Sequence, residues 1–168
     1  IEEILRIHGY DHIPVASLPK PTVIKPSFSH DQRRVRTVRR ALAARGLHEA
    51  TTWSFLSGAD AEVFKADAVL VPLDNPLSAD LDVLRPSLLP NLIHAAGRNA
   101  TRAMPNVALF EIGPRFEGFT PGEQTLVAGG LRSGAPRERH WNKPARIIDA
   151  YDAKADALRA LEAAGVPT

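Results

Sequence analysis

The chain has 168 residues, of which 44% are hydrophobic and 24% are charged, and its formal net charge is +2. These proportions are ordinary for a globular domain, and the small positive excess argues against a surface coated generally by nucleic acid. Cysteine is absent, which excludes disulfides, thiolate metal sites and a cysteine nucleophile and suits a reducing cytoplasm. No apolar run approaches the ~18 residues of a membrane span, so no membrane partner is expected.

The N-terminal residues predict a short helix followed by an extended linker. Ile1 and Ile4 recur at helical spacing, and Gly9 ends the helix before a turn that closes at Pro14. Prolines then recur through residues 15–28, which favours extended, polyproline-like chain over helix. Because the first residue is not methionine and lies inside the predicted helix, we expect a fragment of a longer protein.

The clearest predicted helix covers residues 29–45. Ser29 and Gln32 form a capping box at its start, and Gly46 supplies the stop. Its arginines favour either contact with RNA phosphates or a solvated or protein-binding face, and their spacing alone does not decide between these. Outside one apolar stripe, this helix carries Arg33, Arg34, Arg36, Arg39 and Arg40.

Three short elements are expected next. Residues 49–55 alternate between two faces, which predicts a half-buried strand. Residues 57–65 predict a short helix. The continuous apolar run at 68–73 predicts an interior strand.

A turn, a helix and a strand are predicted in the central part of the chain. Asn75-Pro76 is a turn signal, because proline disfavours the helical conformation of the residue before it. Ser87 can cap a helix that has Pro90 in its first turn. Residues 107–112 predict a mostly buried strand. The apolar face of the helix is made up of Leu88, Leu92, Ile93, Ala96 and Ala100.

One acidic residue, Glu111, falls on the predicted buried face of the strand at 107–112. An unpaired buried carboxylate is costly, so Glu111 needs a cationic partner. A structural ion pair is favoured over a catalytic role. The candidate partners are Arg85, Arg98 and Arg115.

The C-terminal third predicts a strand and a helix. Residues 124–132 read as the strand, in which Gly129-Gly130 indicates a bulge or a close backbone approach. Residues 149–164 predict a closing helix that turns Ala155, Leu158 and Leu161 inward. The order of elements, with short connections in the middle, predicts an α+β fold in which helices flank an antiparallel sheet.

Several short motifs occur in a fixed order along the chain. They are NPLS at 75–78, LRPSLLPNL at 84–92, N..R at 99–102 and LFEIG..F at 109–116. This series resembles the catalytic-like domain of the β subunit of bacterial phenylalanyl-tRNA synthetase. In addition, EEILRIHGYDHIP at 2–14 resembles the end of the winged-helix-like domain that precedes it in that family.

The resemblance implies a domain organisation and a fold. Residues 1–14 would be the tail of the winged-helix-like domain, and residues 15–28 the proline-containing linker. Residues 29–168 would form the catalytic-like domain, incomplete at its C-terminus. The expected fold is that of a class II aminoacyl-tRNA synthetase in a copy that has lost catalysis.

The resemblance also implies a function. The family's enzyme, phenylalanine–tRNA ligase, is a cytoplasmic heterotetramer of two α and two β subunits that uses ATP and magnesium. Its active site lies in the α subunit, so this fragment would be a non-catalytic scaffold that supports assembly and tRNA placement. Alone it is expected to be inactive and not to bind ATP. Its implied partners are the α subunit, a second β subunit and tRNA.

The resemblance also implies roles for individual residues, carried over position by position. Glu2 and Glu3 match half of a magnesium-binding acidic cluster, whose two aspartates are not in this sequence. The arginine helix matches motif 1, which builds the subunit interface, and this favours the protein-binding interpretation of its arginines. The implied interface residues are Arg33, Arg36, Val38, Arg40 and Leu42. The implied structural residues are Asn75, Pro76, Arg85, Asn99 and Glu111.

No catalytic residue is predicted. Arg85 stands at a strand–loop position comparable to the arginine that holds the ATP α-phosphate in catalytic class II enzymes. It has no acidic residue in the ten positions that follow, and no Gly-x-Gly-x-Gly-x-Arg motif occurs later. Two other hypotheses remain, an autonomous RNA-binding module built on the arginine helix and a free-standing ATP-using enzyme; the missing motif weakens the latter.

Overall fold

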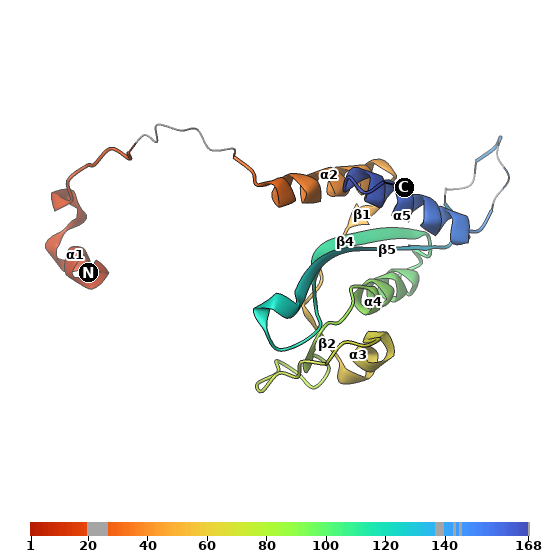
Figure 1. Cartoon of the computed structure of the whole chain (residues 1–168), viewed down its shortest axis with the longest axis horizontal. Helices are drawn as coiled ribbons and strands as arrows, with labels where there is room; N and C mark the ends of the chain where they lie inside the picture. Colours follow the sequence, from red (N-terminus) through yellow and green to blue (C-terminus); the bar gives the residue numbers. More distant parts are fainter. Residues whose placement is uncertain (20–26, 137–139, 143, 145, 168) are drawn as a thin grey trace.

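A computed structural model describes residues 1–19, 27–136, 140–142, 144 and 146–167. At the N-terminus, α1 (Glu2–His8) is followed by the short 3-10 helix η1 (Tyr10–His12) (Figure 1). Of the expected linker, residues 20–26 lie outside the described residues. No described helix combines the length and the apolar character that a membrane span requires.

The main body is built on a long antiparallel hairpin. Strands β4 (Val107–Phe116) and β5 (Gln124–Ser133) pair without interruption along their length. The short strand β1 (His48–Glu49) joins the other edge of β4 in parallel orientation. A separate two-stranded antiparallel sheet consists of β2 (Phe55–Leu56) and β3 (Val83–Leu84). The α+β class is confirmed, whereas the parallel pairing of β1 was not expected.

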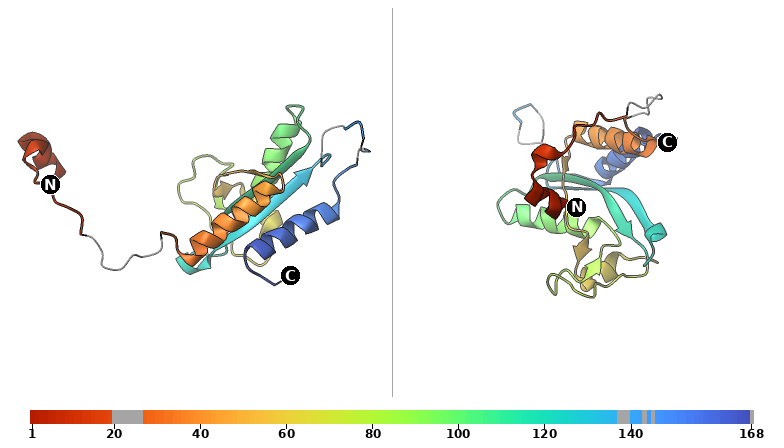
Figure 2. Two further views of the ribbon diagram at one scale, coloured as in Figure 1. Left: turned by 90° about the horizontal axis from the view of Figure 1, so that it is seen from above. Right: turned by 90° about the vertical axis from the view of Figure 1, so that its left-hand side faces the viewer.

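Helices cover both faces of the larger sheet. On one face α2 (His30–Ala44) and α5 (Ala150–Ala163) pack side by side (Figures 1 and 2). On the other face lies α4 (Leu89–Ala100), with α3 (Gly58–Phe64) packed beside it. The core between the sheet and the first pair of helices contains Val38, Leu42, Leu47 and Phe110.

Local capping sets where the helices begin. The Ser29 hydroxyl accepts a hydrogen bond from the Gln32 amide, and the Gln32 side chain accepts one from the Ser29 amide. The carboxylate of Asp149 accepts hydrogen bonds from the amides of Tyr151 and Asp152 at the start of α5. The helices predicted at 29–45, 57–65 and in the C-terminal third therefore form close to their expected bounds.

Two predicted strands are wrong. The strand expected at 49–55 is divided between β1 and β2, because Ala50 still bonds to Phe110 whereas the following residues turn away. The run at 68–73 forms no strand and makes a single bridge, between Pro72 and Val83. Pro72 has no N–H to donate to a ladder, and the side chain of Val69 is exposed.

Several predicted faces also differ. Ile93 and Ala100 of α4 are exposed, and so are Leu158 and Leu161 of α5. The inward face of α5 instead consists of small residues and Asp156, because this helix packs closely against α2 and β5. Val38 and Leu42, expected at a subunit interface, belong to the core. The predicted strand at 107–112 continues to Phe116. Gly129-Gly130 produces no bulge, but a Cβ at Gly129 would lie 3.1 Å from Leu88 Cβ, so a close approach to the start of α4 is present.

Candidate functional site

A buried arginine occupies the centre of the region between the two sheets. Arg85 directly follows β3 and is only 2% exposed. Its Nη1 donates hydrogen bonds to Glu111 Oε1 at 2.8 Å and to Thr52 Oγ1 at 2.9 Å. Nη1 also lies 3.3 Å from the carbonyl oxygen of Trp53, and Nε donates to the carbonyl of Pro114 at 2.9 Å.

The carboxylate of Glu111 completes this cluster from β4. Its Oε2 accepts a hydrogen bond from the Thr52 hydroxyl at 2.7 Å, and the residue is 4% exposed. Of the three candidate partners, the structure brings Arg85 to Glu111, whereas Arg115 pairs with Glu117 and Arg98 is exposed. Both charges are therefore satisfied inside the protein, as buried ions must be.

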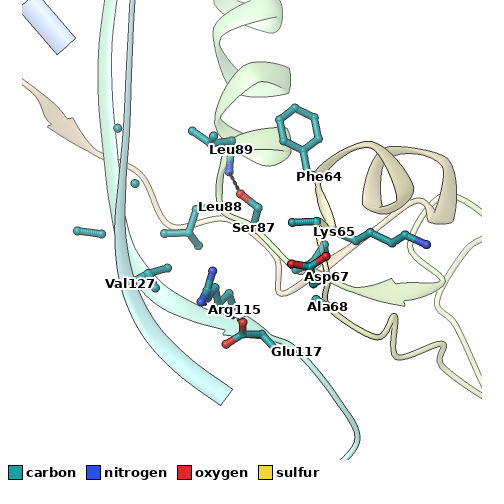
Figure 3. A pocket seen from close by; sticks show the side chains of 15 residues that line it. Phe64, Lys65, Asp67, Ala68, Ser87, Leu88, Leu89, Arg115, Glu117 and Val127 are labelled. Carbon is teal, nitrogen blue, oxygen red and sulfur yellow. Dashed lines mark hydrogen bonds and ion pairs between the residues drawn. The ribbon is translucent and has the colours of Figure 1, made fainter. Parts of the chain in front are cut away.

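A hollow opens next to this cluster, between the end of α3, the start of α4 and the hairpin (Figure 3). Its volume is about 660 Å³. Arg115 lies within it, with Nη2 3.0 Å from Glu117 Oε1, and its buried Nε has no hydrogen-bond partner among the described residues. Asp67 and Glu117 lie beside this guanidinium, and the other cation of the lining, Lys65, pairs with Glu62 at 2.6 Å. Because the two carboxylates oppose an anion, the hollow does not form a phosphate clamp.

The arginines of α2 divide into two groups. Arg39 pairs with Glu49, Arg45 at the end of the helix pairs with Asp156, and Arg34 lies 3.9 Å from Asp31. The other group consists of Arg33, Arg36 and Arg40, which we call the outer arginine strip. Among the described residues, no carboxylate lies within 4.0 Å of these three side chains. They face solvent on the side of α2 opposite the core.

One member of the outer arginine strip is held in place by an aromatic ring. The guanidinium carbon of Arg36 lies 4.2 Å from the centre of the Phe28 ring. Phe28 precedes the helix and is itself partly exposed. The strip is thus open to a partner while one of its side chains is already oriented.

An ion cluster that the sequence did not reveal joins α2, β5 and α5. Asp156 accepts hydrogen bonds from Arg45 and Arg132, and it is 9% exposed. Burial raises the pKa of this carboxyl, but the hydrogen bonds from Arg132 and Arg45 together outweigh that cost and lower the pKa below its ordinary value. The only sequence signal was an acidic residue in the small-residue stripe of a helix.

The two glutamates implied in magnesium binding do not make a magnesium site by themselves. Glu2 and Glu3 are exposed on α1, and adjacent helical residues do not face one another. The carboxylate of Glu3 is 2.8 Å from Arg6. No group of three or more potential metal ligands occurs among the described residues. Glu2 and Glu3 alone therefore do not supply the octahedral set of oxygen ligands that Mg²⁺ requires.

The remaining implied structural residues lie apart from the buried cluster. Asn75 and Pro76 are exposed in the loop before β3. The side chain of Asn99 donates to the carbonyl of Ala95 at 2.8 Å, and its own carbonyl accepts from the Met104 amide at the end of α4. Asn99 thus helps to close that helix.

Comparison with known families places the chain among proteins of translation. The family model described as "Phenylalanyl tRNA synthetase beta chain CLM domain" matches residues 13–168. The phenylalanine–tRNA ligase beta subunit of Paramagnetospirillum magneticum is 56% identical over 165 residues, which cover 98% of this chain and 21% of that protein. The same subunit of Rhodospirillum rubrum is 55% identical over 168 residues, with coverage of 100% and 21%. The chain spans about a fifth of the length of these relatives.

Solved structures share the fold. Pyrrolysyl-tRNA synthetase from Desulfitobacterium hafniense superimposes with a TM-score of 0.59 at 18% identity, covering 99% of this chain and 53% of that one. A histidine–tRNA ligase subunit from Alicyclobacillus acidocaldarius gives a TM-score of 0.54 at 16% identity, with coverage of 92% and 44%. At such identities the likeness shows the fold, that of class II aminoacyl-tRNA synthetases, and not the activity.

Proposed function

The chain belongs to the phenylalanyl-tRNA synthetase β-chain CLM domain family, and we propose that it serves as a non-catalytic scaffold of a phenylalanine–tRNA ligase β subunit. The observation that carries this proposal is the family match over residues 13–168. In the proposed complex the chain supports an active site in the α subunit, takes part in subunit assembly and helps to place tRNA. Charging of tRNA for protein synthesis puts this complex in the cytoplasm.

The surroundings of Arg85 support a scaffold role over a catalytic one. An arginine that clamps a phosphate must present its guanidinium to the ligand. Arg85 instead directs its donors to Glu111, Thr52 and backbone carbonyls. In the proposed complex the α subunit binds ATP, and the chain of 168 residues alone is expected to be inactive.

Magnesium is also assigned to the complex. Glu2 and Glu3 would contribute to an acidic cluster only together with ligands from outside residues 1–168. Their exposure on α1 leaves both carboxylates accessible for that purpose. The ion would supply a bridge between carboxylates and so hold neighbouring parts of the subunit together.

The outer arginine strip is the proposed contact with the α subunit or the second β subunit. Arginine is enriched at protein interfaces. When a partner binds and removes water from guanidinium groups that have no carboxylate nearby, that partner must supply acidic groups. The strip lies on the outer side of α2 and replaces the interface first expected, because Val38 and Leu42 are core residues.

Sedimentation velocity with the α subunit of phenylalanine–tRNA ligase tests this assignment. The wild-type chain should form a stable mixed species, and the double variant Arg36→Glu/Arg40→Glu should weaken it at least tenfold. The matched control is Arg98→Glu/Arg102→Glu, which reverses two exposed charges on α4 and the turn after it, across the sheet from α2. An interface on α2 would be contradicted if both double variants lost affinity for the α subunit equally. It would also be contradicted if neither variant lost affinity while circular dichroism showed that the chains were folded.

The same strip supports a second candidate, an autonomous RNA-binding module. Unpaired arginines beside an exposed aromatic ring suit a phosphate backbone and its bases. Titration of the isolated chain with tRNA at several salt concentrations separates the candidates. A steep loss of affinity with salt, reduced in Arg36→Glu/Arg40→Glu, favours RNA binding, and weak salt-insensitive binding favours the scaffold.

A further inference from the structure

Another hollow opens at the end of the larger sheet where β1 and β4 begin and β5 ends. Its volume is about 500 Å³, and it is bordered by the end of α2, the turn after α4 and the segment after β5. The described residues that line it include three basic side chains, Arg45, His48 and Arg132, and no carboxylate. We call it the basic hollow. It differs from the hollow of about 660 Å³, whose lining contains two carboxylates, and its charge favours an anion.

One carboxylate orients both arginines of the basic hollow. The Nε atoms of Arg45 and Arg132 each lie 2.5 Å from a different oxygen of Asp156. Nη2 of Arg132 also donates to Asp156 and to the carbonyl of Arg45. Asp156 itself is not among the residues that line the basic hollow. Because one carboxylate cannot neutralise two guanidinium groups, an excess positive charge remains beside the hollow in a fixed orientation.

Several hydrogen-bond donors of the lining have no acceptor among the described residues. Asp156 engages only the Nε of Arg45, so both Nη groups of Arg45 stay without a partner there, and so does Nη1 of Arg132. The Asn106 side chain accepts from the Ala135 amide at 2.8 Å through its oxygen, which leaves its NH2 group free among the described residues. Guanidinium and amide donors that line one hollow suit a ligand with several anionic oxygens.

The wall that carries Asn106 is held by local hydrogen bonds. The Ser133 hydroxyl donates to the carbonyl of Pro105 at 2.7 Å, and the Ile148 amide donates to the carbonyl of Gly134 at 3.0 Å. Together with the bond from Ala135 to Asn106, these contacts join the segment before β4 to the segment after β5. A ligand would therefore meet groups that are already ordered, which reduces the entropic cost of binding.

We propose that the basic hollow binds a phosphate group through Arg45, Arg132 and the side-chain amide of Asn106. Arginine suits this ligand because its planar guanidinium donates two parallel hydrogen bonds to phosphate oxygens. The proposal rests on the geometry of the hollow and not on the scaffold role, since none of these residues belongs to the outer arginine strip. The phosphate is either free in solution or part of an RNA backbone, and both sources present the same oxygens.

Calorimetric titration of the chain with sodium phosphate, against sodium chloride at equal ionic strength, tests the proposal. Two or three charge-assisted hydrogen bonds support a Kd of about 1 mM for phosphate. Asn106→Asp keeps the oxygen that accepts from Ala135 but replaces the NH2 group by a negative charge, so phosphate affinity should fall about tenfold. The matched control Asn75→Asp makes the same charge change in the exposed loop before β3 and should alter affinity less than about twofold.

A second variant guards against misfolding of the first. His48→Glu places a carboxylate in the lining at an exposed position and leaves the contacts of Asp156 intact, so it should also weaken phosphate binding about tenfold. Circular dichroism establishes that each variant is folded. No heat beyond that of chloride in the wild type overturns the proposal, and so does phosphate affinity that is unchanged in both folded variants.

Competition with tRNA distinguishes the two sources of phosphate. If the hollow holds a phosphate of an RNA backbone, tRNA should displace inorganic phosphate, and its own affinity should fall in Asn106→Asp. If the ligand is free phosphate, tRNA should leave phosphate binding unchanged. The double variant Arg36→Glu/Arg40→Glu should retain wild-type phosphate affinity, because these arginines do not line the basic hollow. Failure of the phosphate site and failure of the scaffold role are therefore measured separately, and phosphate binding that disappears only in this double variant overturns the assignment to the basic hollow.

Discussion

At the scale of single residues, the close fit around Arg85 is the most constrained feature of the molecule. The cluster forms where β3 and β4 approach, and Gly113 lies directly beside the guanidinium. A Cβ at Gly113 would come within 2.5 Å of Arg85 Nη2 and 3.2 Å of Glu111 Oε1. The absence of a side chain at this position is therefore what allows the buried pair to form.

Substitution Gly113→Ala should destabilise the protein. The added methyl group must displace a charged group that already has its partners, which costs about 1–3 kcal/mol in unfolding free energy. Urea denaturation followed by circular dichroism measures this. Gly97→Ala is the matched control, because a Cβ at this position of α4 would meet nothing within 4 Å and alanine favours helix by up to about 1 kcal/mol. Equal stability of the two variants would show that the cluster is not tightly packed.

At the scale of elements, Asp156 ties three of them together. It lies on α5 and accepts from Arg45 at the end of α2 and from Arg132 on β5. Elsewhere α5 packs only alanines against Val38 and Leu42 of α2, and alanines bury little area, so this ionic contact helps to fix how the two helices sit against the sheet.

The lowered pKa of Asp156 predicts a pH dependence of stability. Since the carboxyl titrates lower in the folded protein than in the unfolded chain, its contribution is fully present above the ordinary pKa of roughly 3.9 and is lost as pH falls through the folded value. Asp156→Asn should therefore lower stability at pH 7, by about 1–3 kcal/mol, and have little effect at the lowest pH.

Thermal unfolding of both proteins between pH 7 and pH 2 measures this difference. Asp152 also has a lowered pKa, caused first by its hydrogen bond from Arg146, and its protonation in acid destabilises both the wild type and the variant. Only the difference between wild type and variant therefore reports Asp156. A difference that is constant with pH would contradict the ionic role.

At the scale of the whole molecule, the chain has the fold of class II aminoacyl-tRNA synthetases, and the buried Arg85 holds separate segments of its interior together. Breaking a buried ion pair is costly because the remaining charge has no partner. The cluster joins the segment after β1, the end of β3 and the hairpin, so its loss should affect the folding of the whole domain.

Substitution Arg85→Met should lower the unfolding free energy by about 3–5 kcal/mol, and the milder Glu111→Gln by about 1–3 kcal/mol, since an amide oxygen can still accept from Arg85. Ligase assembled with the Glu111→Gln subunit should keep its KM for ATP and its kcat per assembled complex. Arg98→Met, at an exposed position, controls for loss of an arginine. A raised KM for ATP without loss of stability would instead indicate that the cluster binds the nucleotide.

Helix starts and the long strands could be predicted because their signals are local. The capping box at Ser29 and the strand pattern around Phe110 use residues close together in sequence. The faces of α4 and α5 were partly mispredicted, because a helix that packs on small residues leaves its leucines outside. The division of the strand at 49–55 depends on bonds to β4 and Arg85, which lie far along the chain.

The sequence by itself determined the family resemblance, the α+β class, the capping box of α2 and the lack of thiol chemistry, since each depends on residue identity or on contacts within a few positions; the cap expected from Ser87 is wrong, because α4 begins after Leu88 without a side-chain cap. Only the tertiary structure decided that Arg85 is the partner of Glu111, that Asp156 joins two arginines, and that β5 ends the sheet. Both ion pairs link residues that are more than twenty positions apart, and for Glu111 the sequence offered three candidate arginines. The tertiary packing determines which arginine pairs with each carboxylate, because a buried charge is stable only where the backbone brings a donor within hydrogen-bonding distance.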